Sequence, residues 1–383
     1  MKIAFVHSFY RSGSSGENRA VEMQLSALRE AGHDVAIFAK HSDQEIKSGQ
    51  DSLRAGLRVV SGIGASPATQ ITTFAPDIVH VHNLFPNWSE SWLQTLEIPL
   101  VATLHNFRPL CAAGTLSRQG EFCGLCPEKG SINAIKHACY RNSRVRTIPL
   151  ALATRNPSLN PILKRADKLV FLSNESREQF ERHGPPNMMS RADIVPNFAE
   201  DSSPRPVNST RPSNESWLYV GRLSEEKGII PLLEHWPRNE RLLVAGDGPL
   251  DGEARRISRD KEVIFLGNLS RNQVAEQMTL ARALIFPSIC LENSPLVVAE
   301  AFSHSLPVIA KSGNVAAQLV SNSGAGAVLE NFSEIGKSLE IVDCHKTEMG
   351  LLARRLFEEQ FSQEKWVHRI EKVYRDAQRG PLG

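Results

Sequence analysis

The stretch from Pro287 to Ile309 places the tightest limit on how this 383-residue chain can fold. A short apolar run, Leu284–Phe286, leads into it and predicts a buried strand. Ser294 and Pro295 then predict a helix start, because Ser is a good N-cap and Pro fits the first helical turn. The helix is expected to end near Ser303, where a second apolar strand follows. The stretch therefore predicts a strand, helix, strand unit of the kind that builds α/β sheets.

Two acidic residues flank the predicted helix start. Glu292 precedes the helix, and Glu300 lies about one and a half turns into it. Free N–H groups and the helix dipole attract anions at such a place, and carboxylates beside them can accept hydrogen bonds from sugar hydroxyls. Two acids at this spacing would by themselves indicate a capping acid and a solvated acid. The flanking residues favour a ligand site instead.

Those flanking residues carry a resemblance to a known family. Pro287-Ser288, Glu300-Ala301 and Leu306-Pro307-Val308, together with the spacing of the two acids, resemble the donor-binding motif of the retaining glycosyltransferases of family 4. The resemblance implies a GT-B fold, in which two Rossmann-like doubly wound α/β domains face a central cleft. It also implies transfer of a sugar from a nucleotide-sugar to an acceptor hydroxyl with retained anomeric configuration, and no required cofactor or catalytic metal. The donor contacts that it implies here are Asn293, Ser294, Pro295, Leu296 and Glu300, with Glu292 at the reacting sugar.

Length and composition agree with a two-domain enzyme. The chain is too long for one compact core, and its 41% hydrophobic and 22% charged residues are ordinary for a globular protein. It has no apolar run of the roughly 20 residues that a membrane span needs, and its N-terminal apolar segment is too short for a signal peptide. We expect a cytoplasmic protein, with a peripheral position at the inner membrane face left open.

The net charge of +2 is unevenly distributed. Residues 129–166 contain eight Lys or Arg and no acid. Such a block can contact anionic lipid or a phosphate-bearing acceptor, and the alternative is a solvated basic surface. No nucleic-acid reader motif accompanies it, so nucleic acid is not an expected partner.

The N-terminus repeats the strand, turn, helix, strand order. Lys2–His7 and Asp34–Phe38 predict strands on either side of a helix from about Glu17 to Ala31. The turn between them contains Gly13 and Gly16, and small residues there allow backbone N–H groups to approach a phosphate. Gly13, Gly16 and Glu17 resemble the family's Gly-rich turn followed by Glu, while a simple tight turn stays an alternative. Residues 40–66 are polar and show little pattern.

Two predicted strands, 77–82 and 100–104, lead into histidines. Ligands bind beyond the carboxyl ends of parallel strands, so His82 and His105 are placed to line a cleft. His105 belongs to Thr103-Leu-His-Asn-Phe107, which resembles the family's Thr-x-His-Asp stretch. The resemblance implies that His105 lies near the donor sugar. The family commonly has Asp where this chain has Asn106, so any role of that Asp carboxylate in the family is in doubt for this chain.

An insertion at residues 108–145 contains four cysteines, Cys111, Cys123, Cys126 and Cys139. The Cys-x-x-Cys pair has the spacing of a zinc knuckle, and a cytosolic chain disfavours disulfides. The insertion therefore predicts either a structural zinc site or free thiols. A catalytic metal is not expected, because four thiolates leave no open position.

Further family-like motifs lie in the second half. Gly221-Arg-Leu-Ser-Glu-Glu-Lys-Gly228 resembles the family's Gly-Arg-Leu-x-x-x-Lys-Gly, so Arg222 and Lys227 are implied to bind the leaving diphosphate. The resemblance also implies donor contacts at Gly221, at Gly246 and Gly248 in a Gly-x-Gly-Pro turn, at Gly267 near the nucleobase, and at Asn197 in an Ile-Pro-Asn-like hinge.

These observations predict an acceptor domain at residues 1–200, a linker at 201–214, a donor domain at 215–360 and a last helix, 361–383, that crosses back to the first domain. A UDP-sugar is the favoured donor and a GDP-sugar is the alternative. The expected acceptor is a glycan or a lipid-linked molecule in bacterial polysaccharide or glycolipid synthesis. Two other functions stay open: a GT-B enzyme of the epimerase type, and a non-catalytic nucleotide-sugar binder.

Overall fold

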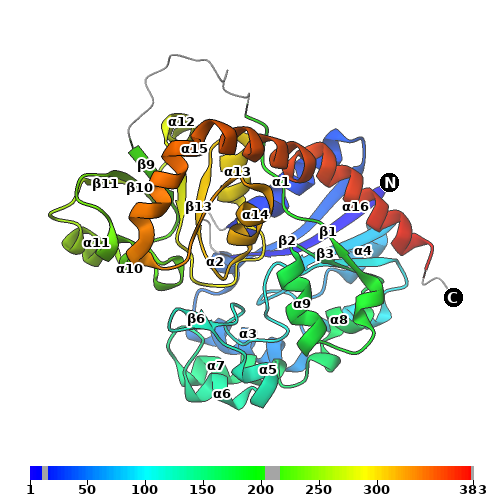
Figure 1. Ribbon diagram of the computed structural model, residues 1–383. Helices are drawn as coiled ribbons and strands as arrows, with labels where there is room; N and C mark the ends of the chain where they lie inside the picture. Colours follow the sequence, from blue (N-terminus) through cyan, green and yellow to red (C-terminus); the bar gives the residue numbers. More distant parts are fainter. Residues whose placement is uncertain (11–15, 203–215, 381–383) are drawn as a thin grey trace. The chain divides into compact units, whose positions relative to one another are not determined.

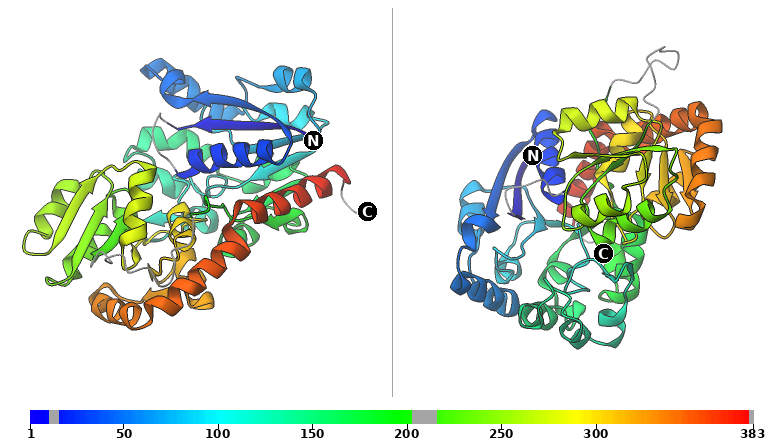
Figure 2. Two further views of the ribbon diagram at one scale, coloured as in Figure 1. Left: turned by 90° about the horizontal axis from the view of Figure 1, so that it is seen from above. Right: turned by 90° about the vertical axis from the view of Figure 1, so that its left-hand side faces the viewer.

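The computed structural model describes residues 1–10, 16–202 and 216–380 and divides into two compact units. The first contains residues 1–116, 123–196 and 366–383, and the second contains residues 117–122 and 197–365. Each unit has its own six-stranded sheet, and every strand pairing within these two sheets is parallel (Figures 1 and 2). The chain changes unit between Pro196 and Asn197, and the expected linker at 201–214 falls mostly outside the described residues.

The sheet of the first unit has the strand order β2-β1-β3-β4-β7-β8. Its strands are β1 Lys2–Phe9, β2 Asp34–His41, β3 Ile78–Asn83, β4 Leu100–Thr103, β7 Lys168–Phe171 and β8 Ala192–Ile194. Ile3, Phe5 and Val6 are fully buried, as expected for a central parallel strand with both faces covered. The strand order reverses between β1 and β3. In such sheets ligands bind outside the carboxyl ends of the strands at this switch point.

The helices of the first unit include the one predicted from about Glu17 to Ala31. They are α1 Gly16–Glu30, α2 Ser42–Glu45, α3 Gly49–Ser61, α4 Ala68–Phe74, α5 Leu125–Lys129, α6 Ile132–Lys136, α7 Arg144–Ala153, α8 Pro161–Arg165 and α9 Asn174–His183, with 3-10 turns at Ser91–Thr95, Pro157–Leu159 and Met188–Arg191. The reading of residues 40–66 as patternless was wrong: α3 lies there, and Ser48 and Asp51 form a capping box at its start.

The sheet of the second unit has the order β11-β10-β9-β12-β13-β14, with its switch point between β9 and β12. Its strands are β9 Ser216–Val220, β10 Arg241–Ala245, β11 Val263–Gly267, β12 Leu284–Phe286, β13 Val308–Lys311 and β14 Gly326–Leu329. This is the strand order of dinucleotide-binding Rossmann folds. A separate two-stranded antiparallel hairpin is formed by β5 Ser117–Arg118 and β6 Glu121–Phe122.

Helices cover both faces of this second sheet. They are α10 Ile229–His235, α11 Asp251–Ile257, α12 Arg271–Leu280, α13 Leu296–Ser303, α14 Val315–Ser323 and α15 Ile335–Leu356, with short turns at Glu225–Lys227 and Phe332–Glu334 and a π-helical turn at Phe357–Phe361. One core cluster is centred on Phe302 and Phe357, and the other on Trp217 and Trp236. Alternate residues of β9 enter the two clusters, because successive side chains of a strand point to opposite faces.

The last helix, α16 Gln363–Gln378, packs from Trp366 onward with the first unit. The Oη of its Tyr374 lies 2.8 Å from Nδ1 of His80 in β3. Glu371 lies 3.0 Å from Nε2 of His33, in the turn before β2. Residues from opposite ends of the chain therefore build one unit.

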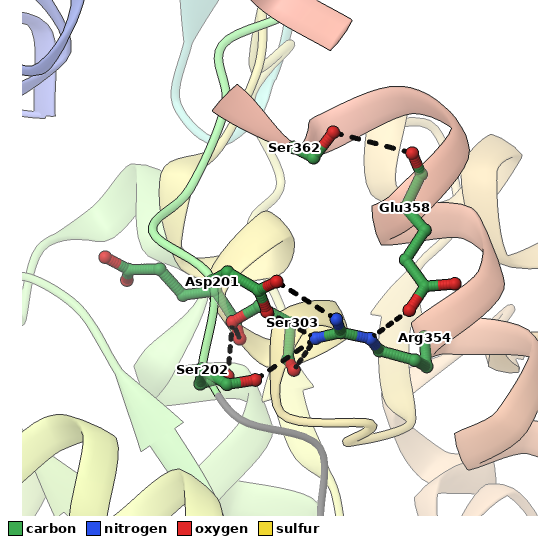
Figure 3. A network of polar contacts seen from close by, with 7 residues as sticks. Asp201, Ser202, Ser303, Arg354, Glu358 and Ser362 are labelled. Atoms are coloured by element: carbon green, nitrogen blue, oxygen red, sulfur yellow. Dashed lines mark hydrogen bonds and ion pairs between the residues drawn. The ribbon is translucent and has the colours of Figure 1, made fainter. Parts of the chain in front are cut away.

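Within the second unit, Arg354 of α15 anchors the segment that follows Asn197 (Figure 3). Its Nη1 donates to the Asp201 carboxylate at 2.6 Å and to the carbonyls of Ser202 and Ser303 at 3.1 and 3.0 Å. Its Nε donates to Glu358 at 2.6 Å. One guanidinium thus fixes the chain where it enters this unit. Across the described part of the chain, no helix has the length and apolar character required to cross a membrane.

Candidate functional site

Backbone hydrogen bonds join the loops that follow β9, β10 and β11, at the carboxyl ends of these strands. The N–H of Gly221 donates to Ala245 at 3.0 Å, the N–H of Gly246 donates to Gly267 at 2.8 Å, and the N–H of Leu223 donates to Asp247 at 2.7 Å. Gly246 has φ +137°, and a Cβ there would lie 2.0 Å from the carbonyl oxygen of Gly221. Only glycine fits this contact, so the loops after β9, β10 and β11 form one compact surface.

Lys227 and Glu292 meet at this switch point, one from the loop after β9 and the other from the loop after β12. The Lys227 ammonium forms an ion pair with Oε1 of Glu292. The hydroxyl of Ser288 donates to the same oxygen at 2.9 Å. Burial raises the pKa of Glu292, but the charge and hydrogen bonds of Lys227 and Ser288 outweigh it and hold the pKa below its ordinary value. Burial lowers the pKa of Lys227, while Glu292 raises it to a net increase, so both groups are ionised at neutral pH.

The start of α13 differs from the sequence prediction in its cap. The helix begins at Leu296 with Pro295 as N-cap, and no side chain caps it. Ser294 is not the cap: its hydroxyl accepts the N–H of Asn197 at 3.1 Å, and its carbonyl accepts the Asn197 amide at 3.3 Å. The first N–H groups of a helix have no intrahelical partner. This helix start therefore keeps the anion-binding character that a side-chain cap would have reduced.

The remaining predicted residues of this unit take different positions. Arg222 is exposed and precedes Lys227 by five residues. Its backbone carbonyl accepts the Tyr219 hydroxyl at 2.9 Å. Asn293 is buried in the loop before α13, and Glu300 lies half-buried within that helix. Gly248 packs against the carbonyl of Leu223, where a Cβ would lie 2.3 Å from that oxygen.

At the switch point of the first unit, Glu17 is surrounded by neutral amides. The Asn83 amide donates to one carboxylate oxygen at 2.6 Å, and the Asn106 amide donates to the other at 3.2 Å. The Asn83 amide also donates to the Tyr10 hydroxyl at 2.8 Å. Burial raises the pKa of Glu17, and these amides and Arg108 oppose the increase only in part. Gly16 is the exposed first residue of α1, while Gly13 lies outside the described residues.

Four histidines, two within β3, one within β1 and one just after β4, lie close together in this unit. Nδ1 of His82 lies 3.0 Å from Nε2 of His105, and the rings of His80 and His82 lie 4.1 Å apart. Nε2 of His7 lies 3.2 Å from Oδ1 of Asn18. Burial lowers the pKa of His7 to about 4 and the pKa values of His80 and His105 to about 3. The cluster is therefore neutral at physiological pH.

The bond between His82 and His105 restricts how each ring holds its proton. Nε2 of His82 is buried and has no hydrogen-bond partner among the described residues. A buried nitrogen without a partner is tolerated better as an acceptor than as an N–H donor. This favours a proton on Nδ1 of His82, donated to Nε2 of His105, which leaves the His105 proton on Nδ1. His82 thus orients the residue that the sequence singled out.

The four cysteines of the insertion do not form a ready metal site. Burial and the neighbouring Cys111, Cys139 and Cys123 raise the pKa of Cys126 to about 11, so the thiols lie in one neighbourhood. Within the described ranges, however, no three His, Cys, Asp or Glu side chains are placed to hold a metal ion. The structural zinc stays a prediction from sequence spacing, and these positions do not fit it.

Sequence reasoning missed several contributors to both switch points. Ser288 was noted only as part of a motif, although its hydroxyl contacts Glu292. Asn83 and Tyr10 were not singled out, although both follow or end strands whose carboxyl ends face the site. Their position directly after predicted strands was the signal that could have identified them.

Two family models match this chain, and their matches correspond approximately to its two units. Residues 14–202 match the family model Glycosyltransferase Family 4, and residues 214–340 match Glycosyl transferases group 1. A putative teichuronic acid biosynthesis glycosyltransferase, TuaC of Bacillus subtilis, is 25% identical over 349 residues, covering 81% of this chain and 80% of the relative. Glycogen synthase of Mycobacterium tuberculosis is 23% identical over 356 residues, covering 81% of this chain and 78% of the relative.

Solved structures show the same fold at low identity. Sucrose-phosphate synthase from Thermosynechococcus elongatus matches with a TM-score of 0.67 and 16% identity, covering 98% of each chain. HepE from Anabaena, solved in complex with UDP, matches with a TM-score of 0.62 and 16% identity, covering 97% of this chain and 99% of its own. WaaG, a glycosyltransferase involved in lipopolysaccharide biosynthesis, matches with a TM-score of 0.64 and 18% identity, covering 97% and 98%.

Proposed function

Because this chain is a GT-B glycosyltransferase of family 4, we propose that it transfers a sugar from a UDP-sugar to an acceptor hydroxyl with retention of configuration and without a divalent metal. The observation that carries this proposal is the ion pair between Lys227 and Glu292. It lies at the switch point of a Rossmann sheet, in the loops that surround the start of α13. Ligands of such sheets bind at this place.

The leaving diphosphate is the part of the donor that gains negative charge as its bond to the sugar breaks. Lys227 supplies a mobile positive charge, and the exposed Arg222 can donate two hydrogen bonds to phosphate. The start of α13 adds backbone donors. Charges that interact more strongly with the transition state than with the bound donor accelerate the reaction.

Glu292 has a second part in this proposal. When the diphosphate binds Lys227, the Glu292 carboxylate keeps the Ser288 hydroxyl and the Cys290 thiol as hydrogen-bond donors. It can then accept hydrogen bonds from the hydroxyls of the donor sugar. Glu300, about one turn after the start of α13, is the candidate for the ribose hydroxyls. The ion pair thus holds both groups ionised until the donor arrives.

Because no covalent nucleophile is evident among the candidate residues, retention requires the acceptor hydroxyl to attack the sugar on the face from which the diphosphate leaves. We infer that a leaving phosphate oxygen accepts the proton of the acceptor hydroxyl, and that His105 lies beside the donor sugar as a neutral imidazole. Burial lowers its pKa to about 3, so it can act as a hydrogen-bond donor but holds no positive charge that would oppose an oxocarbenium-like sugar.

The favoured donor and acceptor come from relatives. HepE was solved with UDP and with UDP-glucose, and the TuaC and WaaG descriptions name teichuronic acid and lipopolysaccharide synthesis. We therefore favour a UDP-sugar over a GDP-sugar, and a polysaccharide or glycolipid acceptor. An epimerase-type enzyme or a non-catalytic binder would bind the donor equally well but would not make a glycosidic bond.

Thermal unfolding with UDP, GDP and ADP, followed by their sugar conjugates, tests the proposal. A ligand at 100 times its dissociation constant adds about 2.7 kcal/mol, which is an easily measured shift. We expect a shift for the uridine series, and release of UDP only when an acceptor is present. Absence of any shift would contradict the donor site. Binding without acceptor-dependent nucleotide release would favour the non-catalytic alternative, and conversion of the sugar itself would favour the epimerase.

A further inference from the structure

Exposed apolar side chains gather in one part of the first unit. Among the described residues of that unit, the exposed large apolar side chains fall only within residues 53–63 and 132–159. They are Leu53, Leu57, Val60, Ile63, Ile132, Val145, Ile148, Leu152 and Leu159. The second unit exposes Phe122, Ile264, Ile341 and Leu351, which are spread over its chain. Single exposed apolar residues are ordinary, whereas a gathered set marks an interaction surface.

Helix α3 presents its apolar stripe to solvent. Leu53, Leu57 and Val60 follow the i, i+4, i+7 spacing of one helix face, yet they are 66%, 61% and 46% exposed. Ala55 is the buried residue of this helix. An amphipathic helix of a globular protein normally turns such a stripe toward the core, so the stripe of α3 is available to another partner.

Helix α7 repeats this arrangement beside α3. Val145, Ile148 and Leu152 are exposed on one side, while Thr147, Leu150 and Ala151 are buried on the other. The two helices touch: a Cβ on Gly56 of α3 would lie 3.2 Å from the ring of Pro149 in α7. Figure 1 shows α3, α6 and α7 together at one end of this unit, and the right view of Figure 2 shows the same segments side by side.

The charge around these helices is positive. Exposed Lys136, Arg141, Arg144 and Arg146 lie within the acid-free segment 129–166. On α3, Arg54 is exposed, and the helix's acid, Asp51, is engaged by the hydroxyl and backbone N–H of Ser48. Apolar stripes beside Lys and Arg are the pattern of helices that lie on an anionic membrane surface.

We propose that the exposed stripes of α3 and α7, with the cations of residues 129–146, form a surface that docks on an anionic lipid bilayer. We name it the α3–α7 surface. Charge complementarity selects this occupant, since a second copy of the same surface would bring like charges together. The proposal goes beyond sugar transfer and holds whether or not the donor-site assignment is correct.

Co-sedimentation of the full chain with vesicles tests it. We expect binding to phosphatidylglycerol vesicles, weak binding to phosphatidylcholine vesicles, and loss of binding as salt rises toward 1 M, where the screening length falls to about 3 Å. The double variant Arg144→Gln, Arg146→Gln should weaken binding about 30-fold, from about fivefold for each charge. The double variant Leu57→Ser, Val145→Ser should weaken it about tenfold or more.

The matched control is the double variant Ile341→Ser, Leu351→Ser, which removes two exposed apolar side chains from the second unit. It should bind like the unaltered chain, and all variants should keep the same thermal unfolding because the altered residues are exposed. Equal losses in the control, or equal binding to both lipids, would overturn the proposal. Light scattering that shows a dimer disrupted by Leu57→Ser, Val145→Ser would assign the surface to a second copy instead.

Discussion

At the switch point of the second unit, between β9 and β12, Glu292 is paired with Lys227, and its pKa lies below the ordinary value. At the corresponding point of the first unit, between β1 and β3, Glu17 is held by the neutral amides of Asn83 and Asn106, and burial raises its pKa. The two sheets place a carboxylate at equivalent points of similar topologies. Neighbouring side chains, and not the fold, decide the direction in which its pKa shifts.

This difference separates two kinds of ligand chemistry. A cation that can leave its carboxylate partner suits a ligand with a diphosphate, because one anion replaces another. A carboxylate held by amides suits a neutral, hydroxyl-rich ligand, because such a ligand can replace the amide donors without displacing an ion-pair partner. The comparison agrees with a donor site in the second unit and an acceptor site in the first.

The largest effect that we expect is selective loss of stability of the first unit in acid. His7, His80 and His105 have lowered pKa values in the folded state, so the unfolded state binds more protons and stability falls as the pH drops below about 6.5. Each of these histidines lowers the free energy of unfolding by about 2 kcal/mol at pH 5 relative to pH 7. Burial raises the pKa of Glu90 to about 7. Its protonation therefore stabilises the folded state by about 2 kcal/mol at pH 5 relative to pH 7.

The expected net loss from these four groups is therefore about 4 kcal/mol in the first unit; the lowered pKa of His82 adds to this loss, and the raised pKa of Glu17 opposes it. Urea unfolding at pH 7 and pH 5, with limited proteolysis to identify which unit opens, measures it. An equal loss in both units would show that the histidine cluster does not distinguish them.

The next largest effect concerns the ion pair of the second unit. Lys227→Ala should lower turnover about 10²-fold or more, equivalent to about 3 kcal/mol, the usual loss for one charge-stabilising donor. Arg222→Ala should act in the same direction. Steady-state kinetics with the donor identified by thermal shift checks both, with the exposed Lys337→Ala and Arg238→Ala as controls. Near-normal turnover in Lys227→Ala and Arg222→Ala would remove these residues from the mechanism.

A smaller effect should follow from placing a second carboxylate beside Glu17 in the first unit. Asn106→Asp would place one within about 3 Å of Glu17, and two carboxylates at this distance share a proton. Because the folded pair binds one shared proton at a pH where both carboxylates are ionised in the unfolded chain, stability is kept in acid and lost as the pH rises. We expect a loss of about 2 kcal/mol at pH 7 and less at pH 5. The exposed Asn239→Asp is the control, and an unchanged pH profile of stability would contradict the prediction.

The smallest effect should come from the residue that orients His105. His82→Phe keeps an aromatic ring beside Phe5 but removes the bond to Nε2 of His105. Turnover should fall about tenfold, equivalent to about 1.4 kcal/mol, while the donor KM stays nearly unchanged. His368→Phe on the exposed side of α16 is the control. A matching rise in KM would show that His82 acts on donor binding instead of on orientation.

Much of the second unit could be predicted from local sequence. The strand at 284–286 and the helix ending at Ser303 follow from short-range rules, and the structure confirms them. The predicted helix start lies within two residues of the observed one, but the N-cap assigned to Ser294 was wrong: the Ser294 hydroxyl accepts the backbone N–H of Asn197 instead. Tertiary contacts override a local capping preference where a distant backbone N–H donates to the side chain that would have formed the cap.

Helix α3 was missed for the opposite reason. Its stripe of Leu53, Leu57 and Val60 was present in the sequence, but long polar stretches on either side obscured the period. The stripe is also exposed. Sequence patterns predict that a helix has an apolar face, and only packing decides whether that face meets the core.

The sequence by itself determined the alternation of strands and helices, the two-unit plan and the identity of Lys227, Glu292 and His105 as candidates, because periodicity and motif spacing are local properties of a chain. Tertiary structure decided which of them meet. The pairing of Lys227 with Glu292 joins residues 65 positions apart, and the bond of His80 to Tyr374 joins residues 294 apart. The charge of a carboxylate or an imidazole depends on burial and neighbours, and distant segments supply both only once the sheets have formed.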